Sequence, residues 1–493
     1  MKIPSAIQPK PAGRVPVPPL WTLAALVLLV AACAGPSAGR VPEHGVGLPA
    51  TWSVGPPAGG DTAAALAQWW ERFDDPVLSD LIVRVLAAST DVQAARARLR
   101  QARAQRDVSA AGLAPGVSAS ASAQRSKQGD ADAANLFRAG FDASWEPDIF
   151  GATRSGVAAA DADVLASAGA LADTRVSVAA EAAVSYLQLR GFQARLAIAR
   201  ENLASQEQTL QLTQWRAQAG LTTSLEVEQA RAAVEQTRAQ LPLLETNIAQ
   251  TLNSLAVLAG QAPGAPPAAL AAPAPLPAVP PDLALAIPAD TLRQRPDVRA
   301  AEQRVVAATA RVDQAAAARL PSFRLSGALG LSALTVSGLS EGEAVLRSVL
   351  ASVSLPVFDG GQRRAQVRVQ QAAFDEAREN YRAAVLTALR DVEDALIALR
   401  KAHEELAARQ RAAAAARNAA LLASNRYASG LIDFQTVLET QRTLLNAQDS
   451  VAGTEAELGV DYVRLYKALG GGWTPAALGE IDDRPPAAAQ GST

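Results

Sequence analysis

The chain contains two copies of one unit, and this repeat constrains the fold more than any other feature of the sequence. Residues 89–120 align with residues 295–326, with DV at 91 over DV at 297 and a proline at 115 over one at 321. Two later motif pairs follow in the same order: EPDIFGATR from 146 with LPVFDGGQR from 355, and AGLTTSLEV from 219 with SGLIDFQTV from 429. The two halves therefore share one order of structural elements.

The repeat sets the expected domain boundaries. We expect the first copy at residues 69–259 and the second at 291–473, with the Ala/Pro-rich residues 260–290 as a linker between them. The glycine-rich LGGGWTP from Leu469 lacks the lysine and the helix context of a phosphate-binding loop, and we expect a frayed end there. Residues 474–493 are expected to be a disordered tail.

Very long helices are indicated by the second copy. The 68 residues from Gln362 to Ser429 include neither glycine nor proline, and at 1.5 Å per residue they would form a helix about 100 Å long. Apolar residues recur there every three or four positions, which is coiled-coil spacing. In the first copy we expect helices of about half that length at Ser79–Leu113 and Ser224–Leu258, so that two short helices stacked end to end match one long one.

Each copy also supplies a pair of alternating segments, which predict strands. They lie at about residues 116–126 and 135–146 in the first copy and at about 322–334 and 347–357 in the second. One parity of each is apolar, and we expect it to face lipid. The aromatic residues on that parity are Phe137, Phe141, Trp145 and Phe323.

These strands have the length that crosses a membrane when tilted. Alternating strands also suit a soluble sandwich, and one hairpin alone would favour that reading. Four strands cannot close a barrel, and open sheet edges do not persist in hydrocarbon. If the strands span a membrane, two or more chains must pool them, giving eight, twelve or sixteen strands.

The N-terminus has the pattern of a secretory signal. Three basic residues precede the apolar run Leu20–Ala32, which is too short to span a bilayer as a helix. We expect residues 1–32 to be a signal peptide and residues 33–68 a lipidated tether, because small residues directly precede Cys33, the only cysteine. This arrangement resembles the lipobox of bacterial lipoproteins, and the absence of aspartate at position 34 implies the outer membrane.

Composition argues against several other functions. A net charge of −2 and a pI near 5.9 give no basic surface for nucleic acid. The two histidines, His44 and His403, lie in no pattern for metal binding or nucleophilic catalysis. We therefore expect no enzyme activity, no metal and no cofactor.

At four places the sequence resembles the outer membrane efflux channel family, the TolC-like superfamily, and within it the NodT or OprM type of lipoprotein from resistance-nodulation-division pumps. The motifs are WWERFDDPVLSDLI (69–82), LRQRPDVRAAEQRV (292–305), LPVFDGGQRRA (355–365) and NRYASGLIDFQTVLETQRTLLNAQ (425–448). The resemblance implies a mainly α-helical protein with a transmembrane β-barrel. In such a protein a homotrimer joins twelve strands above a periplasmic tunnel of long antiparallel coiled-coil helices.

The resemblance also implies roles for particular residues. Four would lie at the periplasmic tips, where related channels meet the hairpin of a periplasmic adaptor (membrane fusion) protein: Gly220, Leu221, Gly430 and Leu431. Four others would take part in a gate: Tyr427, Glu226, Asp433 and Glu439. Thr436 stands where some relatives carry an acid. The implied partners are the adaptor, an inner-membrane pump and outer-membrane lipid.

The expected function is a passive duct for small molecules such as drugs. Two alternatives stay open. The first is the outer-membrane channel of a type I secretion system, and the second is a periplasmic coiled-coil lipoprotein that transports nothing.

Overall fold

The structure is a computed structural model, and it describes residues 66–473 except 128, 131, 265–267, 280–291 and 293. The predicted signal peptide, Cys33, most of the tether and the tail after residue 473 lie outside the described residues. The elements of the first repeat are η1 (Trp69–Phe73), α3 (Pro76–Ala88), α4 (Thr90–Ala111), β1 (Gly116–Ser126), β2 (Ala134–Trp145), α5 (Ala152–Gln218) and α6 (Ser224–Leu258). Those that follow are α7 (Ala268–Ala271), α8 (Pro296–Ala317), β3 (Ser322–Ala333), η3 (Ser337–Ser340), η4 (Gly342–Ala344), β4 (Val345–Ser354), α9 (Gln362–Ala428) and α10 (Phe434–Ala468).

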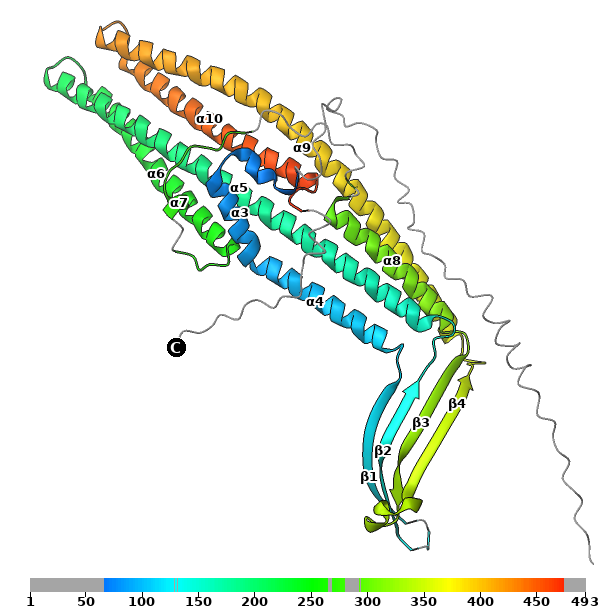
Figure 1. Ribbon diagram of the computed structural model, residues 1–493. Helices are drawn as coiled ribbons and strands as arrows, with labels where there is room; N and C mark the ends of the chain where they lie inside the picture. The colour runs from blue at the N-terminus through cyan, green and yellow to red at the C-terminus, as the bar shows by residue number, and fades with distance from the viewer. Residues whose placement is uncertain are drawn as a thin grey trace, which may run out of the picture.

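Two helices of 67 residues each, α5 and α9, run the length of the helical part. In each repeat, two short helices lie end to end along the long one: α4 and α6 beside α5, and α8 and α10 beside α9 (Figure 1). Helix α5 also packs against α8 and α10, which joins the repeats. The expected long helices and stacked pairs are confirmed. Among the described residues, no helix combines the length and the apolar character needed to cross a membrane.

The expected single helix from Ser79 to Leu113 is wrong, because it is broken at Ser89. The backbone of Ser89 is not helical (φ −53°, ψ 130°), and the side chain is buried. The end of α6 packs at this break: a Cβ on Gly260 would lie 2.7 Å from the carbonyl oxygen of Ala88. No glycine or proline marks the break in the first repeat. The aligned position of the second, Arg295, precedes the proline that begins α8.

The main core lies midway along the helices, where several of the chain's few aromatic side chains pack with leucines, valines and alanines. The ring of Trp69 stacks on that of Tyr466 at 5.3 Å. The expectation of a frayed end at LGGGWTP is also wrong for its described part. Trp473 is buried against Ala172 and Val176, and Gly472 donates a backbone hydrogen bond of 2.8 Å to Leu66.

Part of the predicted linker is held against α5 by a buried arginine. Arg190, only 1% exposed, donates to the carbonyl oxygens of Ala269 (3.0 Å) and Ala272 (2.7 Å). Gln193 donates to the carbonyl of Leu270 at 3.0 Å. These bonds give hydrogen-bond donors to backbone carbonyls in and just after α7, which is only four residues long. The rest of the linker, from residue 280, lies outside the described residues.

The four strands form one antiparallel sheet in the order β1-β2-β3-β4, at one end of the helical part (Figure 1). The register places Phe141 opposite Ala119 on one side and Leu329 on the other. Strand β4 ends at Ser354, before Pro356, because proline has no N–H to donate to the ladder. The sheet is open, with β1 and β4 as its free edges.

Candidate functional site

The sheet has one apolar and one polar face, because paired residues of all four strands share parity. The odd-numbered residues form the apolar face, where Phe141 is 60% and Val349 is 82% exposed. On the polar face, Ser120 donates a hydrogen bond of 2.8 Å to the carboxylate of Asp142. The sheet is a single layer of strands with a large exposed apolar face, so it lacks the second layer that a soluble sandwich would need.

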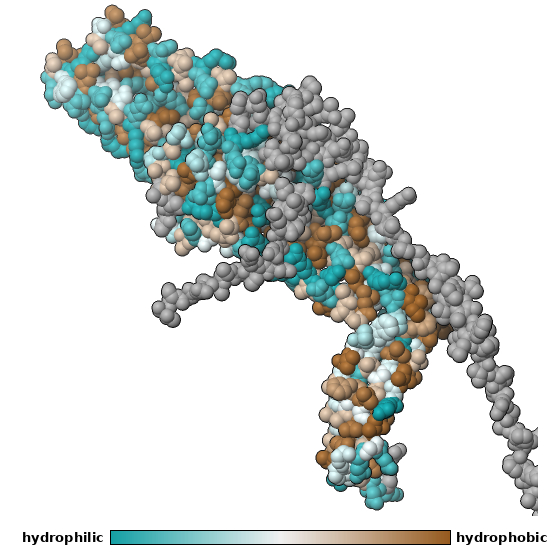
Figure 2. All heavy atoms as spheres, viewed as in Figure 1, coloured by the Kyte–Doolittle hydropathy of each residue, from teal (hydrophilic) through white to brown (hydrophobic). Residues whose placement is uncertain are grey.

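The four aromatic residues predicted to face lipid lie on this apolar face. Phe141 is exposed, whereas Phe323 is half-buried against Phe150, with ring centroids 6.3 Å apart. Trp145, at the end of β2 next to the helices, donates its indole N–H to the carbonyl of Leu113 at 3.0 Å. Figure 2 shows apolar side chains along the visible face of the strands and hydrophilic ones at the far end.

The other end of the molecule has two helix turns with one geometry. In the first, Gly220 has φ +71° and the N–H of Leu221 bonds to the carbonyl of Arg216 at 2.8 Å. In the second, Gly430 has φ +72° and the N–H of Leu431 bonds to that of Arg426 at 2.9 Å. This is the Schellman motif, and its left-handed residue is glycine because that backbone conformation strains other residues.

A leucine follows each of these glycines and points into solvent. Leu221 is 70% exposed and Leu431 is 73% exposed. Because both side chains are exposed on tight turns, they contribute little hydrophobic stabilisation to the folded chain. A partner surface that covered them would gain the transfer free energy of two leucines, about 1.5–3 kcal/mol each.

Behind the turns, the structure brings two of the predicted gate residues together. The hydroxyl of Tyr427, at the end of α9, donates to the carboxylate of Glu226, in the first turn of α6, at 3.2 Å. Thr222 also donates to this carboxylate. Burial raises the pKa of Tyr427, and the negative charge of Glu226 raises it further. The phenol therefore stays protonated and acts as a donor at neutral pH.

The sequence did not single out the third member of this cluster, Arg216. Its guanidinium lies 4.6 Å from the ring centroid of Tyr427, and it donates to the Tyr427 carbonyl at 3.4 Å. A signal was available: an arginine stands four residues before the turn glycine in both repeats, at Arg216 and Arg426. The ring of Tyr427 also packs on Phe434, with centroids 5.3 Å apart.

The other two predicted gate acids do not join the cluster. Asp433 is the N-cap of α10, and it accepts a hydrogen bond of 2.9 Å from the backbone N–H of Thr436. A hydrogen bond from the Thr436 hydroxyl, followed by this backbone bond, lowers the pKa of Asp433. Glu439 is exposed and has no ion-pair partner within the described part of the chain.

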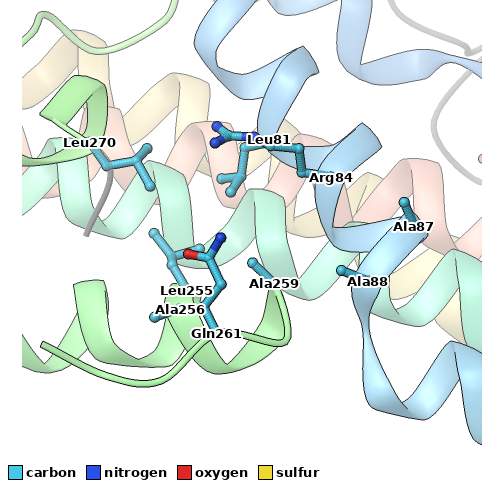
Figure 3. Close-up of a pocket in the computed structure, with 9 residues that line it drawn as sticks. All are labelled: Leu81, Arg84, Ala87, Ala88, Leu255, Ala256, Ala259, Gln261 and Leu270. Carbon is cyan, nitrogen blue, oxygen red and sulfur yellow. The ribbon is translucent and has the colours of Figure 1, made fainter. Parts of the chain in front are cut away.

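An apolar cavity of about 230 Å³ lies between α3, the end of α6 and α7. Figure 3 shows Leu81, Leu255 and Leu270 converging on it. Its single charged group, Arg84, forms an ion pair with Asp80 at 2.8 Å. Among the described residues no three His, Cys, Asp or Glu side chains gather as metal ligands would. The lining of this cavity is that of an apolar contact between helices.

Comparisons with known proteins agree with this geometry. Residues 81–261 and 287–471 match the family model described as outer membrane efflux protein. The chain is 34% identical over 470 residues to the pyoverdine export outer membrane protein OpmQ of Pseudomonas aeruginosa, covering 92% of this chain and 96% of that protein. It is 33% identical to the toluene efflux pump outer membrane protein TtgF of Pseudomonas putida, covering 84% and 87%. The solved structure of the outer-membrane channel OprN superposes with a TM-score of 0.81 at 35% identity, covering 90% of this chain and all of that one.

Proposed function

The chain belongs to the outer membrane efflux protein family, and from that premise we propose that three copies form a passive duct in which each copy contributes four strands to one twelve-stranded barrel. The protein is an outer-membrane efflux channel with its helices in the periplasm. The proposal rests above all on one observation, the open four-stranded sheet with a single apolar face and two free edges. In a membrane, the backbone N–H and C=O groups of a free strand edge have no water to bond to, so further copies must pair with β1 and β4.

The helical tips support an adaptor contact. We infer that Leu221 and Leu431 seat against apolar positions of a periplasmic adaptor protein, because both are exposed on rigid turns at the end furthest from the sheet. An inner-membrane pump would then supply the energy, and the channel would only conduct.

The cluster of Arg216, Glu226 and Tyr427 supports a gate at the same end. It joins helix ends of both repeats, so an adaptor that displaced one turn would strain the contact with the other. Glu439 would add to the gate in a different way. Three exposed carboxylates brought around a threefold axis repel one another, and so they favour a wider aperture.

The cargo is proposed to be small molecules of varied chemistry. The names of the two relatives refer to pyoverdine and to toluene, a polar siderophore and an apolar solvent. Each relative is about one third identical to this chain, at 34% and 33%, although their names refer to such different compounds. We therefore infer that the pump selects the cargo.

Conductance and assembly test the proposal together. The purified, acylated protein should migrate as a heat-modifiable trimer on unboiled gels and should give single-channel steps in planar bilayers. A monomer without conductance would overturn it and favour the periplasmic tether.

A further inference from the structure

The apolar face of the sheet includes two arginines that the efflux function does not explain. Within the described strands, the charged residues of this face are Arg125 of β1 and Arg347 of β4. Both are exposed, and neither has an ion-pair partner in the described part of the chain. An unpaired guanidinium is strongly unfavourable in hydrocarbon but is tolerated at headgroup level.

Their position in the strands agrees with headgroup level. Arg125 is the penultimate residue of β1, which ends at Ser126, and Arg347 is the third residue of β4, which begins at Val345. Both ends lie furthest from the helices (Figure 1). Because the helices are periplasmic, both arginines belong to the extracellular rim. They also lie on the two free edges of the sheet.

The internal repeat gives the register in which those edges meet. Strand β1 corresponds to β3 at an offset of 206 residues, so Gly116 corresponds to Ser322. Their hairpin partners are Ser144 and Ser354, so β2 corresponds to β4 at an offset of 354 − 144 = 210 residues.

Within the chain, β2 pairs with β3, and Phe141 is opposite Leu329. The equivalent pairing between two copies sets β4 of one beside β1 of the next. Phe141 of β2 corresponds to Ala351 of β4 at the offset of 210, and Leu329 of β3 corresponds to Ala123 of β1 at the offset of 206. Ala351 of one copy is therefore opposite Ala123 of the next, and Val349 is opposite Arg125.

In this register, Arg347 of one copy lies two residue pairs beyond Arg125 of the next, on the same face of the sheet. Its partner there is Lys127, an exposed residue just after β1. Diagonal neighbours on one face of an antiparallel pair are about 7–8 Å apart at the backbone, within reach of long side chains. Three cations from two copies therefore converge on the outer surface of each seam, next to the exposed apolar side chain of Val349.

We propose that Arg125 and Lys127 of one copy and Arg347 of the next bind the phosphate headgroup of an anionic lipid at the extracellular rim. The proposal rests on the proposed function, because the seam exists only in the closed assembly. Guanidinium groups bind phosphate oxygens in a bidentate manner. The apolar face below the cations provides contact for acyl chains, which favours a lipid over a soluble anion.

Native mass spectrometry of the detergent-solubilised oligomer tests this site. Titration with phosphatidic acid should give retained lipid, and phosphatidylcholine with the same acyl chains should be retained far less. The double variant Arg125→Gln/Arg347→Gln should weaken retention of phosphatidic acid at least about tenfold, as expected for losing a charged hydrogen bond. Matched controls are Arg138→Gln and Arg324→Gln on the polar face of the same sheet, which should retain the lipid like the natural chain.

Three results would overturn the lipid site: equal retention of the two lipids, no effect of the double variant, or displacement of phosphatidic acid by an equal concentration of inorganic phosphate. A separate arm tests the seam itself. Oxidation of Ala351→Cys/Ala123→Cys should give covalent dimers and trimers, and neither single variant should. If cross-links form and lipid retention fails, the lipid site alone is wrong; if no cross-link forms, the proposed seam and its register are wrong.

Discussion

The phenol of Tyr427 donates a hydrogen bond to the carboxylate of Glu226 at 3.2 Å, although 201 residues separate them in the chain. The bond ties the end of α9 to the start of α6 across the two repeats. At the repeat offset of 210 residues, the equivalents of Tyr427 and Glu226 are Ala217 and Thr436, which cannot form this bond. Each chain therefore has one such tie, and its two tips are not equivalent.

Removing the tie should loosen the closed tip. Tyr427→Phe and Glu226→Gln each weaken the bond with little change in shape, and we expect each to raise basal single-channel conductance or its fluctuation. A hydrogen bond to a charged group contributes about 1.5–3 kcal/mol, so the double variant should add little to either single one. Glu228→Gln is the control, because Glu228 is exposed and, among the described residues, forms an ion pair with Arg231 alone. If conductance is unchanged in Tyr427→Phe, in Glu226→Gln and in the double variant, these residues are not part of the gate.

The exposed leucines should matter to the adaptor and not to the pore. Leu221→Asp/Leu431→Asp replaces two apolar side chains that contact solvent, so folding and conductance should be unaffected. We expect a purified cognate adaptor to lose about 100-fold or more in affinity, measured by surface binding, because two buried leucines contribute several kcal/mol. Leu243→Asp is the matched control, since Leu243 is 63% exposed on the flank of α6. Equal loss in the control would contradict a tip-specific contact.

The fold could be predicted from local sequence to the extent that pattern controls it. Parity sets the faces of the strands, and the run without glycine or proline from Gln362 sets the length of α9. The break at Ser89 was missed because its cause, the approach of Gly260, is a contact between residues far apart in the chain. The position of Arg190 was missed for the same reason, since its acceptors are backbone carbonyls that composition does not reveal.

The candidate gate shows the same limit. The family resemblance pointed to Glu226 and Tyr427, but only the fold shows that they meet. The same resemblance pointed to Asp433, which caps α10. Local capping chemistry and a functional role call for the same residue type at a helix start, so sequence cannot separate them.

The buried Arg190 should stabilise the fold by holding α7. In Arg190→Ala, the carbonyls of Ala269 and Ala272 lose their donors. Each hydrogen bond to a charged group contributes about 1.5–3 kcal/mol, so loss of these two bonds should lower the free energy of unfolding by about 3–6 kcal/mol in urea titrations. Arg200→Ala on the same helix removes an exposed ion pair with Glu245 and should cost less than about 1 kcal/mol. Similar losses in both variants would contradict the anchoring role.

Tyr186 should make stability fall in alkali. Its hydroxyl donates to Asp75 at 2.6 Å, and burial, followed by that bond, raises its pKa from 10.0 to about 12. A raised pKa means that the folded state favours the protonated phenol. The stabilisation is therefore complete below pH 10 and is lost as the pH rises through about 12. The difference in unfolding free energy between the natural chain and Tyr186→Phe should shrink over this range, and a constant difference would contradict the assignment.

Close contact between β2 and β3 should make two glycines necessary for the sheet. Gly140 and Gly330 are directly opposite one another, and a Cβ on Gly140 would lie 2.7 Å from the Cα of Gly330. Backbone cannot move aside as a flexible side chain can, so Gly140→Ala or Gly330→Ala should cost about 1–3 kcal/mol by overpacking. We expect a lower melting temperature of the oligomer band on unboiled gels. Gly327→Ala is the control on the same strand, because its Cβ would meet only the Ser348 carbonyl oxygen at an ordinary 3.6 Å. If Gly140→Ala melts at the same temperature as Gly327→Ala, the two strands do not pack this closely in the assembled barrel.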